Sequence, residues 1–250
     1  MCIRDRSRWK DTSAGFSPRR QAVYFAAAVA IVSLLSALLA TLVFPVILVT
    51  SIALWITINL ADDVLTRLRN KRAKLRALVS QPLSYYGMLF GHMGIVVSMI
   101  GVCCTVYFST EKDVRMLPGE VVSLGGYEFE FHRMKKVQGP NYVADQGEIK
   151  VSRDGEPVTT LFPEKRLYTA SQSVMTEADM DPGFFRDLYV ALGEPVGESA
   201  WAVRVHVKPF VRWIWFGGLL VALGGILAVL DKRYRLSRRT SESVVGASVV

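Results

Sequence analysis

Residues 85–108 form an apolar run, YYGMLFGHMGIVVSMIGVCCTVYF, in which His92 is the one side chain that titrates near neutral pH. A helix of ~20 apolar residues is long enough to span the ~30 Å hydrocarbon core of a bilayer. An ionisable side chain inside such a span is costly, so it marks a candidate site that needs a partner. The run therefore predicts a membrane span with a candidate site at His92.

Two other parts of the chain are also long and uncharged. Residues 22–60 run for 39 positions without a charge, and a single helix of that length would measure about 58 Å, twice the hydrocarbon core. We therefore expect two spans, about 22–39 and 44–60, with the turn within 40–45, because Pro45 disfavours a helix that continues through it. Residues 209–230 begin with aromatic and basic side chains typical of membrane entry and supply a fourth span.

Charge is distributed unevenly along the chain. Residues 1–21, 61–84 and 231–250 hold 17 Lys and Arg against 6 Asp and Glu, a net of +11, whereas residues 109–212 hold 13 against 16, a net of −3. Membrane proteins keep their positively charged loops in the cytoplasm. We expect the three basic segments, and so both termini, in the cytoplasm, and the middle segment outside. A bilayer partner, and no nucleic acid, accounts for the overall charge of +8.

The basic segments themselves give weaker structural signals. Residues 1–7, MCIRDRS, do not lead naturally into the polar segment 8–21, and we interpret them as a scar outside the fold. The loop 61–84 has leucines in an amphipathic pattern, which fits either a helix on the membrane surface or a solvated connector. Residues 231–250 are expected to be a cytoplasmic tail.

Residues 109–208 have the signals of β-strands. Residues 127–131 alternate apolar and polar side chains, and Asp154-Gly155 is a hairpin-turn pair between the strands expected at 148–151 and 158–162. Further strands are expected at 119–124, 187–192 and 200–207. The predicted fold is therefore an α-helical membrane protein of four spans with one extracytoplasmic antiparallel β-rich domain, a small barrel or sandwich.

A stripe of small residues accompanies His92 in its span. Gly87, Gly91, Gly94, Ser98 and Gly101 recur at spacings of 4, 3, 4 and 3, which lets another helix or a flat ligand approach closely. His92 lies about 100° round the helix from this stripe at position 91. Three roles remain open for it: a structural hydrogen bond, a proton relay, or axial ligation of haem iron.

Other candidate sites are weaker. The remaining histidines, His132 and His206, have no second metal ligand in a recognised spacing, and we interpret them as ordinary sheet or surface residues. Cys103 and Cys104 are expected to be buried thiols. The carboxylates of 175–192 suggest a solvated loop. No glycine-rich nucleotide loop and no G-x-S-x-G motif occurs, so we assign no catalytic residue.

Several longer runs carry a resemblance to a known family. The chain resembles the C-terminal part of the CcmF family, the haem lyase subunits of bacterial cytochrome c maturation, and the related NrfE-type proteins. The match is dense over residues 82–236 and rests on hydropathy alone over 22–81. The matching runs are YGM at 86–88, GHMG at 91–94, EKDVR at 111–115, GPN at 139–141, EKR at 164–166 with Tyr168, MTEA at 175–178, RDLYVALGE at 186–194, AWAVR at 200–204 and KPFVRWIW at 208–215.

The resemblance implies a function and a cofactor. Family members attach haem covalently to apocytochrome c and hold a b-type haem between two membrane histidines. His92 matches the second of these histidines, with Gly91 and Gly94 packing against a helix or the haem. The first histidine and the tryptophan-rich haem-handling motif lie upstream in the family and are absent from this chain. The chain therefore looks like about the last third of such a protein, and the fragment alone is expected to be inactive.

The implied partners are a haem chaperone, apocytochrome c and other cytochrome c maturation subunits. The implied location is the bacterial inner membrane, with the domain 109–208 in the periplasm. A second hypothesis comes from a different class: a non-catalytic membrane scaffold that docks maturation partners through the periplasmic domain.

Overall fold

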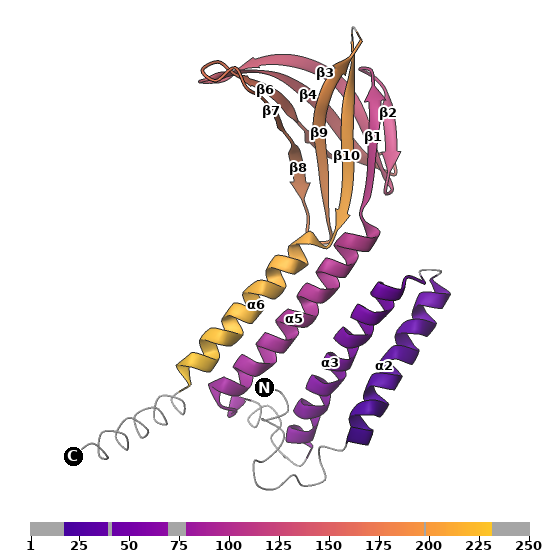
Figure 1. The fold of residues 1–250 in the computed structure, drawn as a ribbon, viewed down its shortest axis with the longest axis vertical. Helices are drawn as coiled ribbons and strands as arrows, with labels where there is room; N and C mark the ends of the chain where they lie inside the picture. The colour runs from indigo at the N-terminus through magenta and orange to yellow at the C-terminus, as the bar shows by residue number, and fades with distance from the viewer. Residues whose placement is uncertain (1–17, 40–41, 70–78, 198, 232–250) are drawn as a thin grey trace, which may run out of the picture. The chain divides into compact units, whose positions relative to one another are not determined.

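The computed structural model describes residues 18–39, 42–69, 79–197 and 199–231. The chain divides into two compact units. One unit contains the helices, and the other, residues 104–212, contains the strands together with the adjoining end of one helix and start of another. The ribbon in Figure 1 labels the helices and, except for β5, the strands.

Within the described residues, four helices are long and apolar enough to cross a membrane: α2 (Pro18–Leu38), α3 (Phe44–Leu68), α5 (Leu83–Phe108) and α6 (Val211–Leu230). The four predicted spans are thus present as helices. Pro45 lies in the first turn of α3, where a missing N–H costs no helical hydrogen bond.

Helix α3 continues well past the predicted end of its span at residue 60. Its last turns carry charges that are paired: Asp62 accepts from Arg20 of α2 at 2.6 Å, and Asp63 accepts from Arg67 at 2.9 Å. These pairs stabilise the polar end of the α2–α3 hairpin. The leucine-rich connector after α3 falls largely on residues 70–78, which lie outside the described residues.

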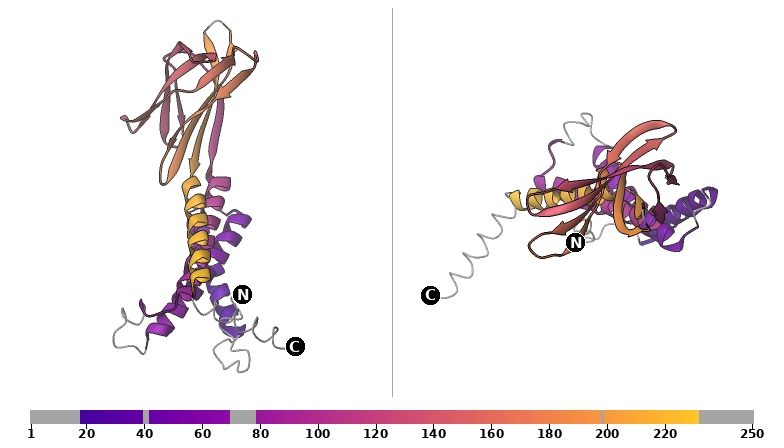
Figure 2. Two further views of the ribbon diagram at one scale, coloured as in Figure 1. Left: turned by 90° about the vertical axis from the view of Figure 1, so that its left-hand side faces the viewer. Right: turned by 90° about the horizontal axis from the view of Figure 1, so that it is seen from above.

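The β unit consists of two antiparallel sheets, which form two layers in Figures 1 and 2. The first has the order β1 (Thr110–Met116), β10 (Ala200–Pro209), β9 (Arg186–Val196), β8 (Asp179–Pro182). The second has the order β2 (Val121–Leu124), β3 (Tyr127–Gln138), β4 (Tyr142–Arg153), β6 (Glu164–Tyr168), β7 (Val174–Glu177), with β5 (Glu156–Leu161) paired to β4.

Apolar side chains from both sheets meet in one core. Phe129 and Phe131 of the second sheet and Leu188, Leu192 and Val205 of the first are fully buried within it. The inward residues alternate with exposed ones along β3, so the alternation seen at 127–131 has the expected cause. The predicted β-rich domain is confirmed, and of the two shapes considered it is the sandwich.

The predicted hairpin turn at Asp154-Gly155 is confirmed. It joins β4 to β5, and both residues have positive φ, 53° and 83°. Two consecutive left-handed residues suit the right-handed twist of the flanking strands.

The strand predicted at 187–192 is confirmed as part of β9, whereas the interpretation of the acidic segment before it as a solvated loop was wrong, since that segment holds β7 and β8. Strands β1 and β6 were not predicted either. Strand β1 is polar over most of its length, yet it pairs with β10 from Thr110 to Met116. These strands form because a partner strand satisfies their backbone groups, which local alternation cannot reveal.

Candidate functional site

His92 lies in the first half of α5, with its ring Nδ1 2.8 Å from the carbonyl oxygen of Met88. A carbonyl oxygen only accepts, so Nδ1 carries the hydrogen and donates it. In the neutral imidazole the lone pair then belongs to Nε2. The backbone of α5 therefore selects the tautomer whose Nε2 can act as a base or a metal ligand.

The face of α5 that carries His92 contacts α3. Tyr85 and Cys103 are buried on α5, and their spacings of 7 and 11 residues from His92 return to within about 20° of the same direction. The Arg67 guanidinium of α3 lies 4.4 Å from the centre of the Tyr85 ring, and the Cys103 thiol interacts with the Thr50 hydroxyl. His92 is therefore on the α3 side of α5.

The stripe of small residues lies on a different side of α5, against α6. A Cβ placed on Gly94 would lie 2.5 Å from the Gly217 carbonyl oxygen, and one on Gly87 would lie 2.7 Å from that of Gly224. These distances are below any real Cβ contact, so the two backbones touch at these positions. The Ser98 hydroxyl also donates to a carbonyl oxygen of α6 at 3.2 Å.

Gly91 takes part in the same contact through its backbone. A Cβ added to Gly224 would lie 2.6 Å from the Gly91 nitrogen, whereas a Cβ on Gly91 itself meets no atom within 4 Å. The sequence left open whether a helix or a flat ligand approaches this stripe. In the described residues helix α6 lies there, so a ligand on His92 would occupy another side of α5, toward α3.

A haem group fits the donor chemistry of His92 but needs a second ligand. Haem iron takes a neutral imidazole nitrogen as axial ligand, and with Nδ1 donating to the Met88 carbonyl oxygen that nitrogen would be Nε2. The chain has three histidines, and the other two lie on strands β3 and β10. The described residues hold no group of three or more His, Cys, Asp and Glu side chains able to bind a metal.

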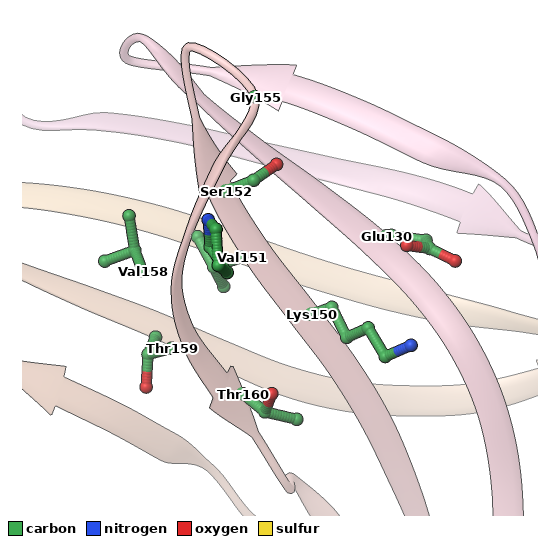
Figure 3. A pocket seen from close by; sticks show the side chains of 9 residues that line it. Glu130, Lys150, Val151, Ser152, Gly155, Val158, Thr159 and Thr160 are labelled. Atoms are coloured by element: carbon green, nitrogen blue, oxygen red, sulfur yellow. The ribbon is translucent and has the colours of Figure 1, made fainter.

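A shallow hollow of about 550 Å³ lies on the outer face of the second sheet, beside the β4–β5 hairpin. Figure 3 shows Glu130, Lys150 and Thr160 at its lining, and the strand register pairs these three residues across β3, β4 and β5. His132 sits at the bulge of β3, with Nδ1 3.4 Å from the Lys150 Nζ and 3.7 Å from a Glu130 oxygen. These exposed groups suit polar contact with a partner surface.

A second hollow, of about 490 Å³, lies over the first sheet. Arg204 donates two hydrogen bonds to the Asp113 carboxylate, at 2.6 and 2.7 Å, and this lowers the pKa of Asp113. The small residues Ala191, Gly193 and Ala202 line the hollow beside this pair. The result is a concave strip with a fixed charge pair at its edge.

The remaining histidine, His206, is buried in the same sheet. Burial lowers its pKa, and its Nδ1 lies 3.3 Å from a Glu111 oxygen without hydrogen-bond geometry. Its ring packs edge-on to Tyr189, with 5.2 Å between ring centres. It is a packed strand residue.

Arg186 was not singled out in the sequence, yet it links the two sheets. It donates to the Asp181 carboxylate at 2.5 Å and to the Tyr127 hydroxyl at 3.1 Å. Tyr127 is 59 residues away in the chain. A pattern limited to neighbouring residues carries no signal for such a link.

The helices and the sandwich together define the class: a multi-span membrane protein with one β-sandwich domain between its last two described spans. Residues 107–209 match the family described as the CcmF C-terminal beta-sandwich. The chain is 48% identical over 233 residues, 93% of its length, to the cytochrome c-type biogenesis protein CcmF of Pseudomonas aeruginosa. It is 50% identical over 152 residues, 61% of its length, to that of Escherichia coli. The chain belongs to the CcmF family.

The match covers part of each relative. The chain spans 35% of the Pseudomonas protein and 24% of the Escherichia coli protein. A solved structure of the cytochrome c heme lyase CcmF has the same fold, with a TM-score of 0.69 at 18% identity over 88% of this chain and 36% of that one. The predicted resemblance to the C-terminal part of this family is confirmed.

Proposed function

We propose that the chain acts in bacterial cytochrome c biogenesis as part of a membrane haem lyase, which attaches haem to apocytochrome c. The 48% identity to a CcmF protein over 93% of this chain carries the proposal. Because the chain spans about a third of that relative, the complete reaction belongs to a larger assembly. We propose that the fragment alone is inactive.

Within that assembly His92 would be one axial ligand of a b-type haem. The hydrogen bond to the Met88 carbonyl oxygen orients its ring and leaves Nε2 as the nitrogen that would bind the iron. When bound, such a haem supplies one-electron redox chemistry. His92 follows the first residue of α5 by nine positions, or ~14 Å at 1.5 Å per residue. If α5 begins at the cytoplasmic face, His92 lies in the cytoplasmic half of the membrane and serves redox relay, not thioether formation.

The proposed location is the inner membrane, with both termini cytoplasmic and the β-sandwich periplasmic. The charge asymmetry supports it, since the segments outside residues 109–212 carry a net +11 and that segment a net −3. The even number of apolar helices in the described chain supports a topology with both of its ends on the same side of the membrane.

A docking role for the sandwich is favoured by its two hollows, one lined by charged and small polar residues and the other by small apolar residues beside the Asp113–Arg204 pair. Candidate occupants are the haem chaperone, apocytochrome c or another maturation subunit. This scaffold role is compatible with the haem role in one assembly.

The ligand assignment is tested by His92→Ala in the chain assembled with the rest of its protein. We expect the reduced-minus-oxidised absorbance of the b-type haem to fall to background, and added imidazole to restore part of it. His132→Ala, on an exposed strand, is the matched control and should keep full absorbance. Unchanged absorbance in His92→Ala would show that another residue ligates the haem.

The same preparation separates docking from ligation. If the sandwich docks partners, maturation subunits should co-purify with His92→Ala as well as with the unmodified protein. Joint loss of haem and partners would tie association to the helical site and contradict a docking role of the sandwich.

A further inference from the structure

We propose that the β8–β9 loop inserts its two phenylalanines into the lipid interface, giving the β-sandwich a membrane contact separate from its connecting helices. Phe184 and Phe185 form the tip of this loop, and they are 58% and 61% exposed. Adjacent exposed aromatic rings are costly in water and favourable at the boundary between lipid headgroups and hydrocarbon.

Hydrogen bonds hold the β8–β9 loop as an ordered turn. The Gly183 N–H donates to the Arg186 carbonyl oxygen at 2.9 Å and faces the Asp187 carboxylate at 3.1 Å. A Cβ on Gly183 would lie 2.6 Å from that carbonyl oxygen, so the turn requires glycine. The Arg186 side chain is itself held by Asp181 and Tyr127. The hydrogen bonds of Gly183 and Arg186 therefore hold the backbone on both sides of the two phenylalanines.

The loop lies at the end of the sandwich from which α6 departs. The Phe210 N–H donates to the Phe185 carbonyl oxygen at 3.0 Å, and their ring centres are 5.9 Å apart. Phe210 has φ of +58°, which is uncommon for a bulky residue and shows that surrounding contacts impose this bend. The next residue, Val211, begins α6.

The end of α5 reaches the same place. The Thr105 hydroxyl, in the last turns of α5, donates to the Pro209 carbonyl oxygen at 2.8 Å. The domain's entry and exit therefore meet beside the β8–β9 loop, at the shared end of β8 and β10 in Figure 1. Because both helices are apolar enough to cross a membrane, this end of the domain is held at the bilayer surface.

Because the β8–β9 loop lies beside the end of α5 and the start of α6, we expect its exposed rings to contact lipid. Strand β9 runs from Arg186 at this end to Val196 at the other, a path of ~33 Å at about 3.3 Å per residue. Val196 is also apolar and 39% exposed, so it provides a matched position far from the proposed contact. The proposal does not depend on the haem assignment.

Site-directed spin labelling tests this contact. The full chain, with Cys2, Cys103 and Cys104 replaced by Ala, would carry a nitroxide at Phe184→Cys, Phe185→Cys or Val196→Cys in phosphatidylcholine vesicles. Electron paramagnetic resonance then measures collisions with oxygen, which concentrates in lipid, and with a nickel chelate, which stays in water. We expect at least a fivefold lower nickel-to-oxygen collision ratio at 184 and 185 than at 196.

Equal ratios at the three positions would place the loop in water and overturn the proposal. Low collision rates with both reagents at 184 and 185 would place the rings against protein and overturn it as well. The thermal unfolding of each labelled variant is compared with that of the cysteine-free chain, which shows whether the substitution and label leave the fold intact.

Discussion

At the scale of single residues, the sandwich is organised by charge pairs that join strands. Glu148 of β4 accepts from Arg133 at 2.7 Å and lies 3.1 Å from Lys135, both on β3. These contacts, chiefly the Arg133 hydrogen bond, lower the pKa of Glu148 from 4.5 to about 2. Two cations thus share one carboxylate just beyond the β3 bulge.

This shift gives a pH dependence of known sign. Since the folded pKa is lower than the unfolded one, the Glu148 pairs contribute fully above pH 4.5 and are lost as pH falls toward 2. We expect the unfolding temperature of Glu148→Gln to fall less between pH 5 and pH 3 than that of the unmodified chain. Circular dichroism melts in detergent measure this. Glu156→Gln, on the hairpin strand β5, is the control, and an acid profile of Glu148→Gln equal to that of the unmodified chain would contradict the assignment.

At the scale of elements, α5 serves two neighbours with two faces. Its small residues touch α6, and the face with His92 contacts α3. Small residues at an interface let helix backbones approach closely, which is a main source of helix association in lipid. Helix packing against α6 and the candidate haem ligand His92 therefore lie on different faces of α5.

Gly94→Ala should therefore weaken the α5–α6 pair. Its Cβ would lie 2.5 Å from the Gly217 oxygen and 2.7 Å from the Val221 nitrogen, and such overpacking costs about 1–3 kcal/mol. Denaturation in mixed micelles with increasing sodium dodecyl sulfate, followed by circular dichroism, measures the change. Gly91→Ala is the matched control, because its Cβ meets no atom within 4 Å. Equal destabilisation by both substitutions would show that side-chain volume at the α6 contact is not the cause.

At the scale of the whole molecule, the question is which side of the membrane the sandwich occupies. In a cysteine-free chain, Glu156→Cys on β5 should react with a membrane-impermeant maleimide in cells whose outer membrane has been opened. Val79→Cys, 77% exposed before α5, should react only after the inner membrane is broken. The positive-inside rule gives this order, because residue 79 belongs to a basic segment. The reverse order would invert the proposed topology.

Much of the architecture was predictable because its causes are local. An uncharged run of sufficient length, such as residues 85–108, predicts a membrane span. The pair Asp154-Gly155 predicts a tight hairpin in the same local way. Strands β1 and β6–β8 escaped prediction because short polar strands depend on pairing with distant segments. For the candidate site, the apolar run was enough to single out His92. The sequence did not decide whether a helix or a flat ligand packs against the glycine stripe.

The sequence by itself determined the number of spans, the β-rich domain, the charge asymmetry and the family, since each follows from composition, periodicity or runs of neighbouring residues. The tertiary structure alone decided which helix faces and loops contact one another. It placed α6 on the glycine stripe, the His92 face of α5 toward α3, and the Phe184–Phe185 turn beside the start of α6. The physical reason is that side-chain contacts depend on rotation about helix axes and on strand register, which long-range packing fixes and short-range preference does not.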